Sequence, residues 1–230
     1  MYKRQNQVTI TSFGNNPILA QENTNTTFRY TLDENGNAIL YPMEDKENLY
    51  IPSTITVCKN KIKVAGLGKF ACYNSSKLEK VVVEEGITNF KIGECAFSDC
   101  TKLKSITFPS NNELKVLEIA DYAFEKTMLE SFIVPNSVSV LNLGEGIFYG
   151  SSKLTKFNLP LNVNFKTLNV GDYVFCNTAL KSFVVPSSVS NLKIGYKAFS
   201  VNVGIKSNLK TFILPLLSLI HISEPTRLGM

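Results

Sequence analysis

The sequence predicts a repeat solenoid, mainly of β-strands with short helical turns, in about six coils behind an N-terminal β-hairpin cap. Three observations predict this fold class. A strand-like heptad that ends in proline recurs along the chain, a block from glycine to phenylalanine comes before each copy, and a second strand-like stretch completes each unit. The leucines that begin the heptads are 25, 26, 25, 26 and 29 residues apart, a period typical of stacked coils. These leucines are Leu78, Leu103, Leu129, Leu154, Leu180 and Leu209.

The first block is the strand–proline heptad. Its pattern is L-x-x-φ-x-φ, where φ is apolar, and it alternates in its second half, which predicts a short strand with one buried side. The proline ends the strand because it has no N–H to give to a ladder. The copies are LKSITFP (103–109), LESFIVP (129–135), LTKFNLP (154–160), LKSFVVP (180–186) and LKTFILP (209–215), after an earlier copy, LEKVVVE (78–84), with Glu84 in the proline position.

The second block runs from a glycine, which permits a sharp turn, to a phenylalanine that we expect to point inward and fill the coil. An acidic residue follows the turn and suits the positive end of a short helical turn. The copies are IGECAF (92–97), IADYAF (119–124), LGEGIF (143–148), VGDYVF (170–175) and IGYKAF (194–199). The acids are Glu94, Asp121, Glu145 and Asp172, and the inward residues are Phe97, Phe124, Phe148, Phe175 and Phe199, with Cys72 in the first copy.

The third block closes each coil with a second short strand on the opposite wall. Its copies are ITNFKIG (87–93), LKVLEIA (114–120), VSVLNLG (138–144), FKTLNVG (165–171) and VSNLKIG (189–195). One such unit cannot bury its apolar side alone, so stacking of the units makes the core.

These blocks, in fixed order, resemble the BspA-like class of the leucine-rich repeat family, with its G-x-x-A-F…L-x-x-I-x-I-P unit. The resemblance covers about residues 49–215. The chain departs from the pattern at Cys72, at Glu84, at Ala120 in a glycine position and in a longer loop at 200–208. The resemblance implies an extracellular or cell-surface protein that serves adhesion and partner binding.

Residues 28–68 are expected to form an N-terminal cap, which terminal repeats need to cover one end of the core. FRYTLDENGNAILYP (28–42) predicts a hairpin that turns at Asn35 and Gly36, and LYIPSTI (49–55) repeats the strand–proline corner as a zeroth coil. The DENGN loop (33–37) lacks the downstream glutamate of an EF-hand, so a plain turn is expected there. Residues 6–27 are interpreted as a linker or the tail of a preceding segment.

Both ends of the chain leave the repeat pattern. MYKRQ (1–5) and LSLIHISEPTR (217–227) are similar to translations of one sequencing-adapter end, read on opposite strands. We therefore expect residues 1–5 and 217–230 to derive from an adapter, and the repeats (69–216) to be truncated at their C-terminal end. The absence of a signal peptide then carries no information, and the apolar run 212–222 is too short to span a membrane.

Composition and charge exclude several functions. Hydrophobic residues make up 44% of the chain and charged residues 19%, which is typical of a folded chain. The formal net charge of +5 falls to about +3 without the expected adapter residues, and no basic stripe indicates nucleic-acid binding. The only histidine, His221, lies in the expected adapter, so no Ser-His-Asp or Cys-His catalytic site is predicted. The repeated acids are expected to be exposed, so we predict no enzyme.

Five cysteines (58, 72, 95, 100 and 176) contain no C-x-x-C pair, so no metal or cofactor site is predicted. They are interpreted mainly as small buried hydrophobic residues, with one disulfide at most.

Two functions remain. The first is a non-enzymatic module whose strand face binds a protein or glycan through outward strand residues, with Lys104 beside them. The alternative explanation for the valines and isoleucines in that row is strand propensity alone. The second function is a structural spacer that presents another domain and has no ligand of its own. The predicted partner-binding residues are Val82, Lys104, Thr107, Ile133, Asn158, Val184 and Ile213.

Overall fold

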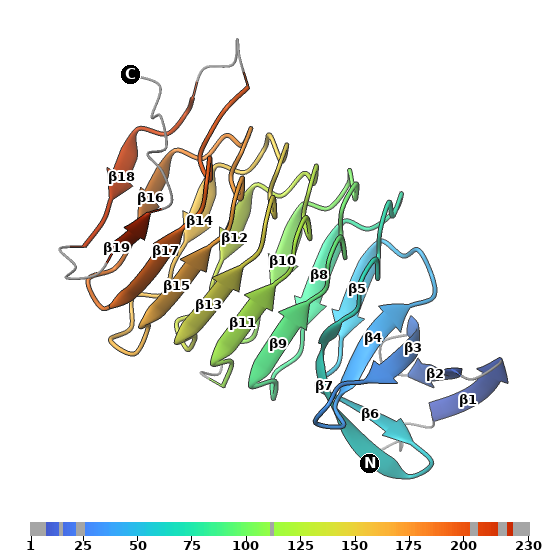
Figure 1. Cartoon of the computed structure of the whole chain (residues 1–230). Helices are drawn as coiled ribbons and strands as arrows, with labels where there is room; N and C mark the ends of the chain where they lie inside the picture. The colour runs from blue at the N-terminus through green and yellow to red at the C-terminus, as the bar shows by residue number, and fades with distance from the viewer. Residues whose placement is uncertain are drawn as a thin grey trace, which may run out of the picture.

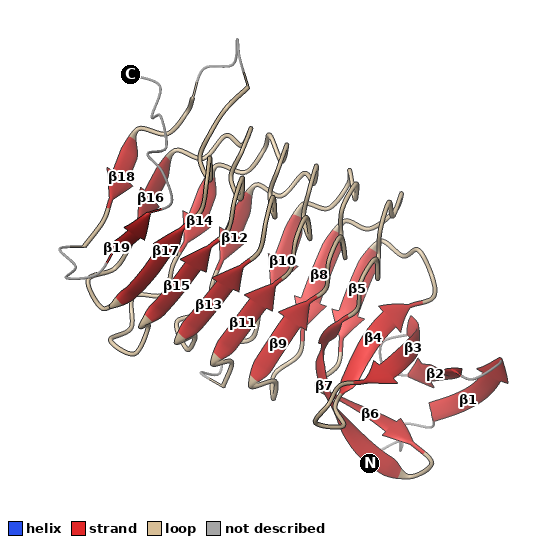
Figure 2. Ribbon diagram, in the orientation of Figure 1, coloured by secondary structure: helices blue, strands red, loops and turns tan. Residues whose placement is uncertain are grey.

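The computed structural model describes residues 8–13, 16–21, 26–110, 113–202, 207–215 and 220–222. The described residues form strands and no helix, wound into a row of stacked coils (Figure 1; Figure 2). The predicted solenoid is therefore confirmed, but its turns are not helical. The expected adapter segments, 1–5 and 217–230, lie outside the described residues except for 220–222.

One wall of the solenoid is a long sheet, to which each coil adds a parallel strand. The third block of the repeat forms five of these strands, as predicted, because its alternate apolar residues point into the coil. In spatial order the strands of this wall are β7 (Asn60–Leu67), β9 (Asn89–Ile92), β11 (Val116–Ile119), β13 (Val140–Leu143), β15 (Thr167–Val170), β17 (Asn191–Ile194) and β19 (Ile220–Ile222). The first strand comes from the expected cap, and the last, at 220–222, comes from the expected adapter segment.

The opposite wall is made of shorter strands from the strand–proline heptads. They are β5 (Asn48–Ile51), β8 (Lys80–Val83), β10 (Ser105–Thr107), β12 (Ser131–Ile133), β14 (Lys156–Asn158), β16 (Ser182–Val184) and β18 (Thr211–Ile213). Their ladder is interrupted: β5, β8 and β10 pair, β12 pairs with β14, and β16 pairs with β18. The ladder is interrupted at the two coils of 26 residues. In these coils the corner runs from Pro109 to Leu117 or from Pro160 to Leu168, and it is longer than the corner from Pro135 to Leu141 in a coil of 25 residues. The coils therefore alternate between two kinds.

The third side of each coil carries consecutive turns whose hydrogen bonds join neighbouring coils. The N–H of Phe97 donates to the carbonyl oxygen of Ala123 at 2.8 Å. Two residues of the run, Cys95 and Asp99, have φ values of 52° and 58°. Left-handed residues interrupt the helical pattern, so these N–H groups bond across coils instead of within a helix.

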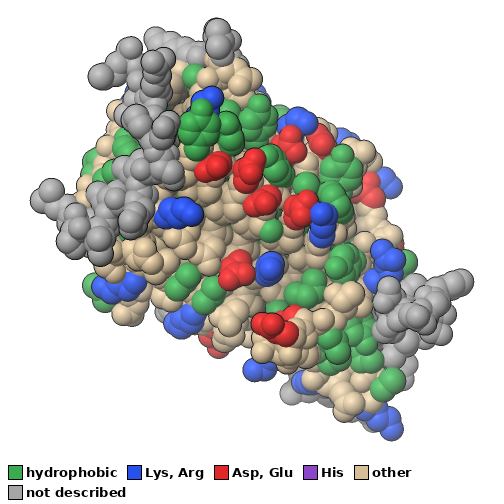
Figure 3. Space-filling model, in the orientation of Figure 1, with side chains coloured by type: hydrophobic (Ala, Val, Ile, Leu, Met, Phe, Trp, Pro, Cys, Tyr) green, Lys and Arg blue, Asp and Glu red, His purple; other side chains and the backbone are tan. Residues whose placement is uncertain are grey.

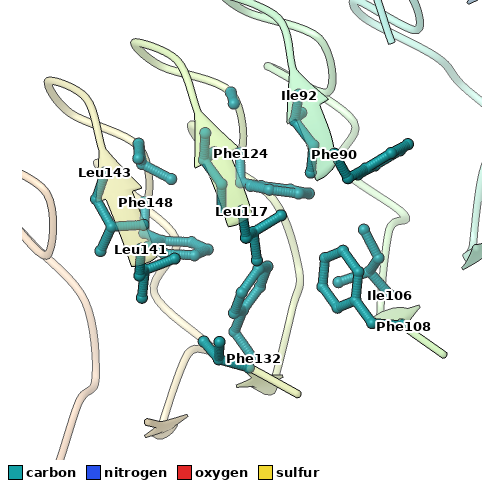
Figure 4. Close-up of a cluster of buried hydrophobic side chains, with 14 of the residues drawn as sticks. Phe90, Ile92, Ile106, Phe108, Leu117, Phe124, Phe132, Leu141, Leu143 and Phe148 are labelled. Carbon is teal, nitrogen blue, oxygen red and sulfur yellow. The ribbon is translucent and has the colours of Figure 1, made fainter. Parts of the chain in front are cut away.

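Two columns of phenylalanine rings fill the interior. The predicted column contains Phe97, Phe124, Phe148, Phe175 and Phe199, with successive ring centroids 5.1, 5.6, 5.7 and 5.1 Å apart. A second column comes from the short strands and contains Phe132, Phe157, Phe183 and Phe212. Figure 4 shows Phe124, Phe132 and Phe148 pointing into the space between the walls. Edge contacts such as Phe132–Phe148, at 5.3 Å, join the columns into one core.

The N-terminal cap contains two hairpins. The predicted one joins β3 (Thr26–Leu32) to β4 (Ala38–Pro42), with Gly36 at φ 76°, and the long sheet continues from β4 into β7. The second hairpin joins β6 (Thr54–Val57) to β7 and was not predicted, since its turn uses Cys58 and Lys59 with positive φ. Within 6–27, β1 (Val8–Phe13) and β2 (Asn16–Gln21) extend the sheet beyond β3. The domain boundary at residue 28 stays a prediction.

Candidate partner-binding face

The outward residues of the short strands form one row, which we call the short-strand face. Each lies between two inward residues, which are buried except beside Ile213, where they are half-buried, and it therefore points to solvent. Across the ladder, Thr107 pairs with Val82, Ile133 with Asn158, and Val184 with Ile213. Val82 is half-buried; Thr107 and Asn158 are exposed, and the exposed fractions of Ile133, Val184 and Ile213 are 59%, 46% and 51%.

One further residue, Tyr50, belongs to this row and was not among the predicted partner-binding residues. Tyr50 pairs with Val82 at the outward position of β5, and 45% of its surface is exposed. The sequence pattern does indicate Tyr50, because LYIP (49–52) repeats the strand–proline corner as a zeroth coil.

A groove lies in the middle of the face, where the ladder is interrupted between β10 and β12. Its volume is about 530 Å³, and its lining includes Thr107, Ile133 and Asn158 from the predicted row. Pro109 and Pro135 contribute to its walls, and Leu161, which is 81% exposed, stands at its edge. Leu161 lies in a long corner outside the repeat register, so the pattern of the heptads did not indicate it.

Lys104 lies apart from this groove and is paired. Its ammonium group donates a 2.7 Å hydrogen bond to the carboxylate of Glu79, a half-buried residue of the preceding coil. This bond lowers the pKa of Glu79 and raises the pKa of Lys104. Lys104 therefore stabilises a contact between coils, which would have to open before the ammonium group bound a partner.

The outward side of β9, β11, β13, β15 and β17, here called the long-sheet face, is mostly polar; its outward valines, Val116 and Val140, are half-buried. The outward residues enclosed between two buried ones are Lys91, Glu118, Asn142, Asn169 and Lys193. The amide of Asn169 donates a 2.7 Å hydrogen bond to the side-chain oxygen of Asn142 in the neighbouring coil. Figure 3 shows this side of the molecule, with acidic side chains gathered in a band across the coils.

The repeated acids do not cap helical turns, which corrects the sequence interpretation. Asp121 accepts a hydrogen bond from the N–H of Glu145 at 2.8 Å, and Asp172 accepts one from Tyr196 at 2.7 Å. Each aspartate thus bonds to the backbone of the next coil. Glu94 forms a 2.8 Å ion pair with Lys69, and Glu145 accepts a hydrogen bond from the Tyr122 hydroxyl.

Within the described part of the chain, no three histidine, cysteine, aspartate or glutamate residues lie together as a metal-binding group. None of the described residues forms a helix that could cross a membrane. All five cysteines are free: Cys100 and Cys176 are buried, as expected, whereas Cys58 is exposed and Cys72 and Cys95 are half-buried.

The chain was compared with known proteins. The model of the BspA type leucine-rich repeat region matches residues 66–206, in six copies. The solved structure of a T. pallidum leucine-rich repeat protein is similar, with 24% identity and a TM-score of 0.62 over 85% of this chain and 82% of that one. A leucine-rich cell surface protein from Faecalibacterium prausnitzii A2-165 is 19% identical with a TM-score of 0.51; the match covers 88% of this chain and 55% of that protein. No curated protein matches the chain.

Proposed function

The chain belongs to the BspA-type leucine-rich repeat family, and we propose that it is a non-enzymatic interaction module that binds a protein or glycan partner through the short-strand face. The observation that carries the proposal is the exposed, mostly apolar row along this face. Its groove, about 530 Å³ in volume, gives the row a concave centre. Concave apolar surfaces with a few polar groups are typical of binding sites.

Strand propensity is the competing explanation for the row, and the long-sheet face argues against it. Within one coil, Ile133 and Asn142 occupy equivalent positions, each outward and enclosed between two buried strand residues. Propensity alone should favour β-branched residues at both positions. The middle outward positions of the long sheet carry lysine, glutamate or asparagine instead. From β9 to β17 the middle outward positions carry no apolar residue, although Val116 and Val140 are apolar at first outward positions. This contrast with the middle outward positions of the short strands favours a partner at the short-strand face.

The groove supports recognition through apolar contacts with a few polar ones. Ile133 and the two prolines provide apolar surface, while Asn158 and Asn136 provide amide groups at the same place. The amides could form hydrogen bonds with a peptide or a sugar, which orient a partner better than apolar contacts do. We further propose an extracellular or cell-surface location and a role in adhesion, in line with the description of the F. prausnitzii neighbour as a cell surface protein.

The second candidate is a structural spacer without its own ligand. The phenylalanine column that runs from Phe97 to Phe199 favours it, since a continuous core joins the coils into one stiff unit. A spacer does not require the apolar row, which is why we place it second.

The test pairs two variants of the full chain. Ile133→Asp with Val184→Asp places carboxylates on the short-strand face, and Asn142→Asp places one at the matching position of the long sheet. Binding is measured on arrays of glycans and extracellular-matrix proteins. We expect the double variant to weaken binding by about 30-fold or more, as loss of central interface residues does, while Asn142→Asp keeps it. Equal binding by both variants, or no binding by the unaltered chain, would favour the spacer.

A further inference from the structure

The phenylalanine column on the turn side has no phenylalanine in the first coil. The N–H of Cys72 donates to the carbonyl oxygen of Ala96 at 2.7 Å, as that of Phe97 donates to Ala123 at 2.8 Å. The two residues therefore hold the same position in successive coils. A thiol is much smaller than a benzyl group, so Phe97 has no ring stacked on this side from position 72.

A cavity of about 220 Å³ opens beside Cys72. Its inner wall comes from the first coil, including Ala71 and Leu78, and its outer wall from the cap, including Pro42 and Leu49. An apolar cavity of roughly 150 Å³ holds a benzene molecule. The space is therefore large enough for one six-membered ring.

The polar part of the wall is held in place by its own hydrogen bonds. The carboxylate of Asp45 accepts bonds from the N–H and hydroxyl of Ser76, at 3.1 and 2.9 Å, and from the hydroxyl of Ser75. Glu44 forms a 2.8 Å ion pair with Lys46. Desolvation raises the pKa of the Cys72 thiol, so this group stays neutral. Both carboxylates are thus already engaged, Asp45 by hydrogen bonds and Glu44 by an ion pair, and a neutral ligand suits such walls.

Aromatic and thioether groups surround the opening. Phe70, Tyr73 and Met43 line it, and their exposed fractions are 49%, 51% and 45%. Phe70 and Tyr73 lie edge to face with ring centroids 5.6 Å apart. A further ring could add to such a cluster by the same edge-to-face contacts, and a thioether also packs well against rings.

We propose that this cavity binds one neutral aromatic ring, which packs beside Cys72 between the cap and the first coil. The ring belongs either to a free aromatic molecule or to a tyrosine or phenylalanine side chain of another protein. The site goes beyond the proposed partner-binding face, because its lining residues belong to the cap and the first turn run and not to the outward row.

Two probes distinguish the sources of the ring. p-Cresol represents a free ring, and a pentapeptide with one phenylalanine between serine and glycine residues represents a side chain. Calorimetry and saturation-transfer NMR on the full chain measure their binding. Tighter binding of p-cresol assigns the site to a small molecule, and tighter binding of the peptide assigns it to a protein partner. Failure of both to bind at millimolar concentration overturns the proposal.

Cys72→Phe tests the position directly. The new ring should fill part of the cavity from position 72 and weaken probe binding by about tenfold or more. Cys72→Met fills the cavity with a flexible side chain and gives the same test if the phenylalanine variant does not fold. Cys58→Ser, in the remote β6–β7 turn, is the matched control and should bind as the unaltered chain does. Undiminished binding by a folded Cys72 variant would contradict the proposal, whereas the Ile133→Asp and Val184→Asp variant should still bind the probes.

Discussion

The short-strand face and the long-sheet face are built by the same coils but differ in what they present to solvent. Both consist of parallel strands whose alternate residues enter one core. At the middle outward position, the coil that begins at Leu129 carries Ile133 on one face and Asn142 on the other. On the short-strand face this isoleucine is 59% exposed, although burial is the usual environment of its side chain.

The difference separates two roles of the repeat. Inward residues of both faces are apolar because they must fill the coil, so they report on folding. Outward residues experience similar backbone geometry on both faces, so a chemical difference between them reflects what they contact, which is a neighbouring coil, as for Asn142 and Asn169, or a partner.

The short-strand face and the long-sheet face should both depend on one phenylalanine core for their stability. Phe148 contacts four other phenylalanines, from both columns, and is fully buried. Phe148→Ala should lower the free energy of unfolding by about 3–5 kcal/mol, through lost transfer energy and a cavity. Urea unfolding followed by circular dichroism measures the loss. Phe70→Ala, at a half-exposed ring, is the control; a similar loss there would mean that the two columns do not carry the stability.

The comparison can also be reversed by substitution. Asn142→Ile with Asn169→Val gives the long-sheet face the apolar residues of the other face. We expect this variant to self-associate, because adjacent exposed apolar side chains form a sticky patch. Light scattering and size-exclusion chromatography over a concentration series measure it. A variant that stays monomeric and fully soluble would show that an apolar row has little effect on association in this solenoid.

The polar face should contribute to stability through contacts between coils. Asn169→Ala removes the hydrogen bond to Asn142 and should cost about 1 kcal/mol of unfolding free energy, the usual net worth of such a bond. Asn191→Ala, at an exposed position of β17, is the control. Equal urea midpoints for the two variants would mean that the asparagine pair is merely a surface contact.

The smallest effect is expected at Lys104. Its bond to Glu79 lowers the pKa of Glu79 below 4.5, so the bond is lost as the pH falls through that lowered value. The bond also raises the pKa of Lys104 above 10.5, so it is lost as the pH rises through that raised value. Any stabilisation thus lies between these limits, and solvent screening keeps it small. Lys104→Ala should hardly change the urea midpoint at pH 7 and not at all at pH 2. A clear loss at pH 7 would assign Lys104 a structural role.

Much of the solenoid could be predicted from residue pattern. The inward direction of Phe97 and its equivalents follows from their fixed position after the glycine turn. Stacking follows because one unit cannot bury its own apolar side. The column of Phe132, Phe157, Phe183 and Phe212 was not predicted as a stack. Alternation indicates that these residues point inward, but the ring contacts depend on the distance between the walls, which the sequence pattern does not give.

Other features of the structure were not predicted from the sequence, each for a local reason. The β6–β7 hairpin turns at Cys58 and Lys59, which are not typical of left-handed turns, so no turn signal marked it. The expected role of the acids was wrong because a helical turn was assumed. The outward row could be predicted from the heptads. Its groove could not be predicted, because the corner residue Leu161 lies outside the repeat.

The alternation of coils has a consequence for how such an array can grow. The coil lengths of 25 and 26 residues add to a unit of 51, which separates Leu78 from Leu129 and Leu129 from Leu180. Duplicating or deleting one coil would place two coils of the same kind side by side and mismatch their corners. Duplicating the 51-residue pair would preserve every neighbour relation. The unit that can be duplicated without a mismatch is therefore a pair of coils, and such a duplication would add the outward residues of two coils together.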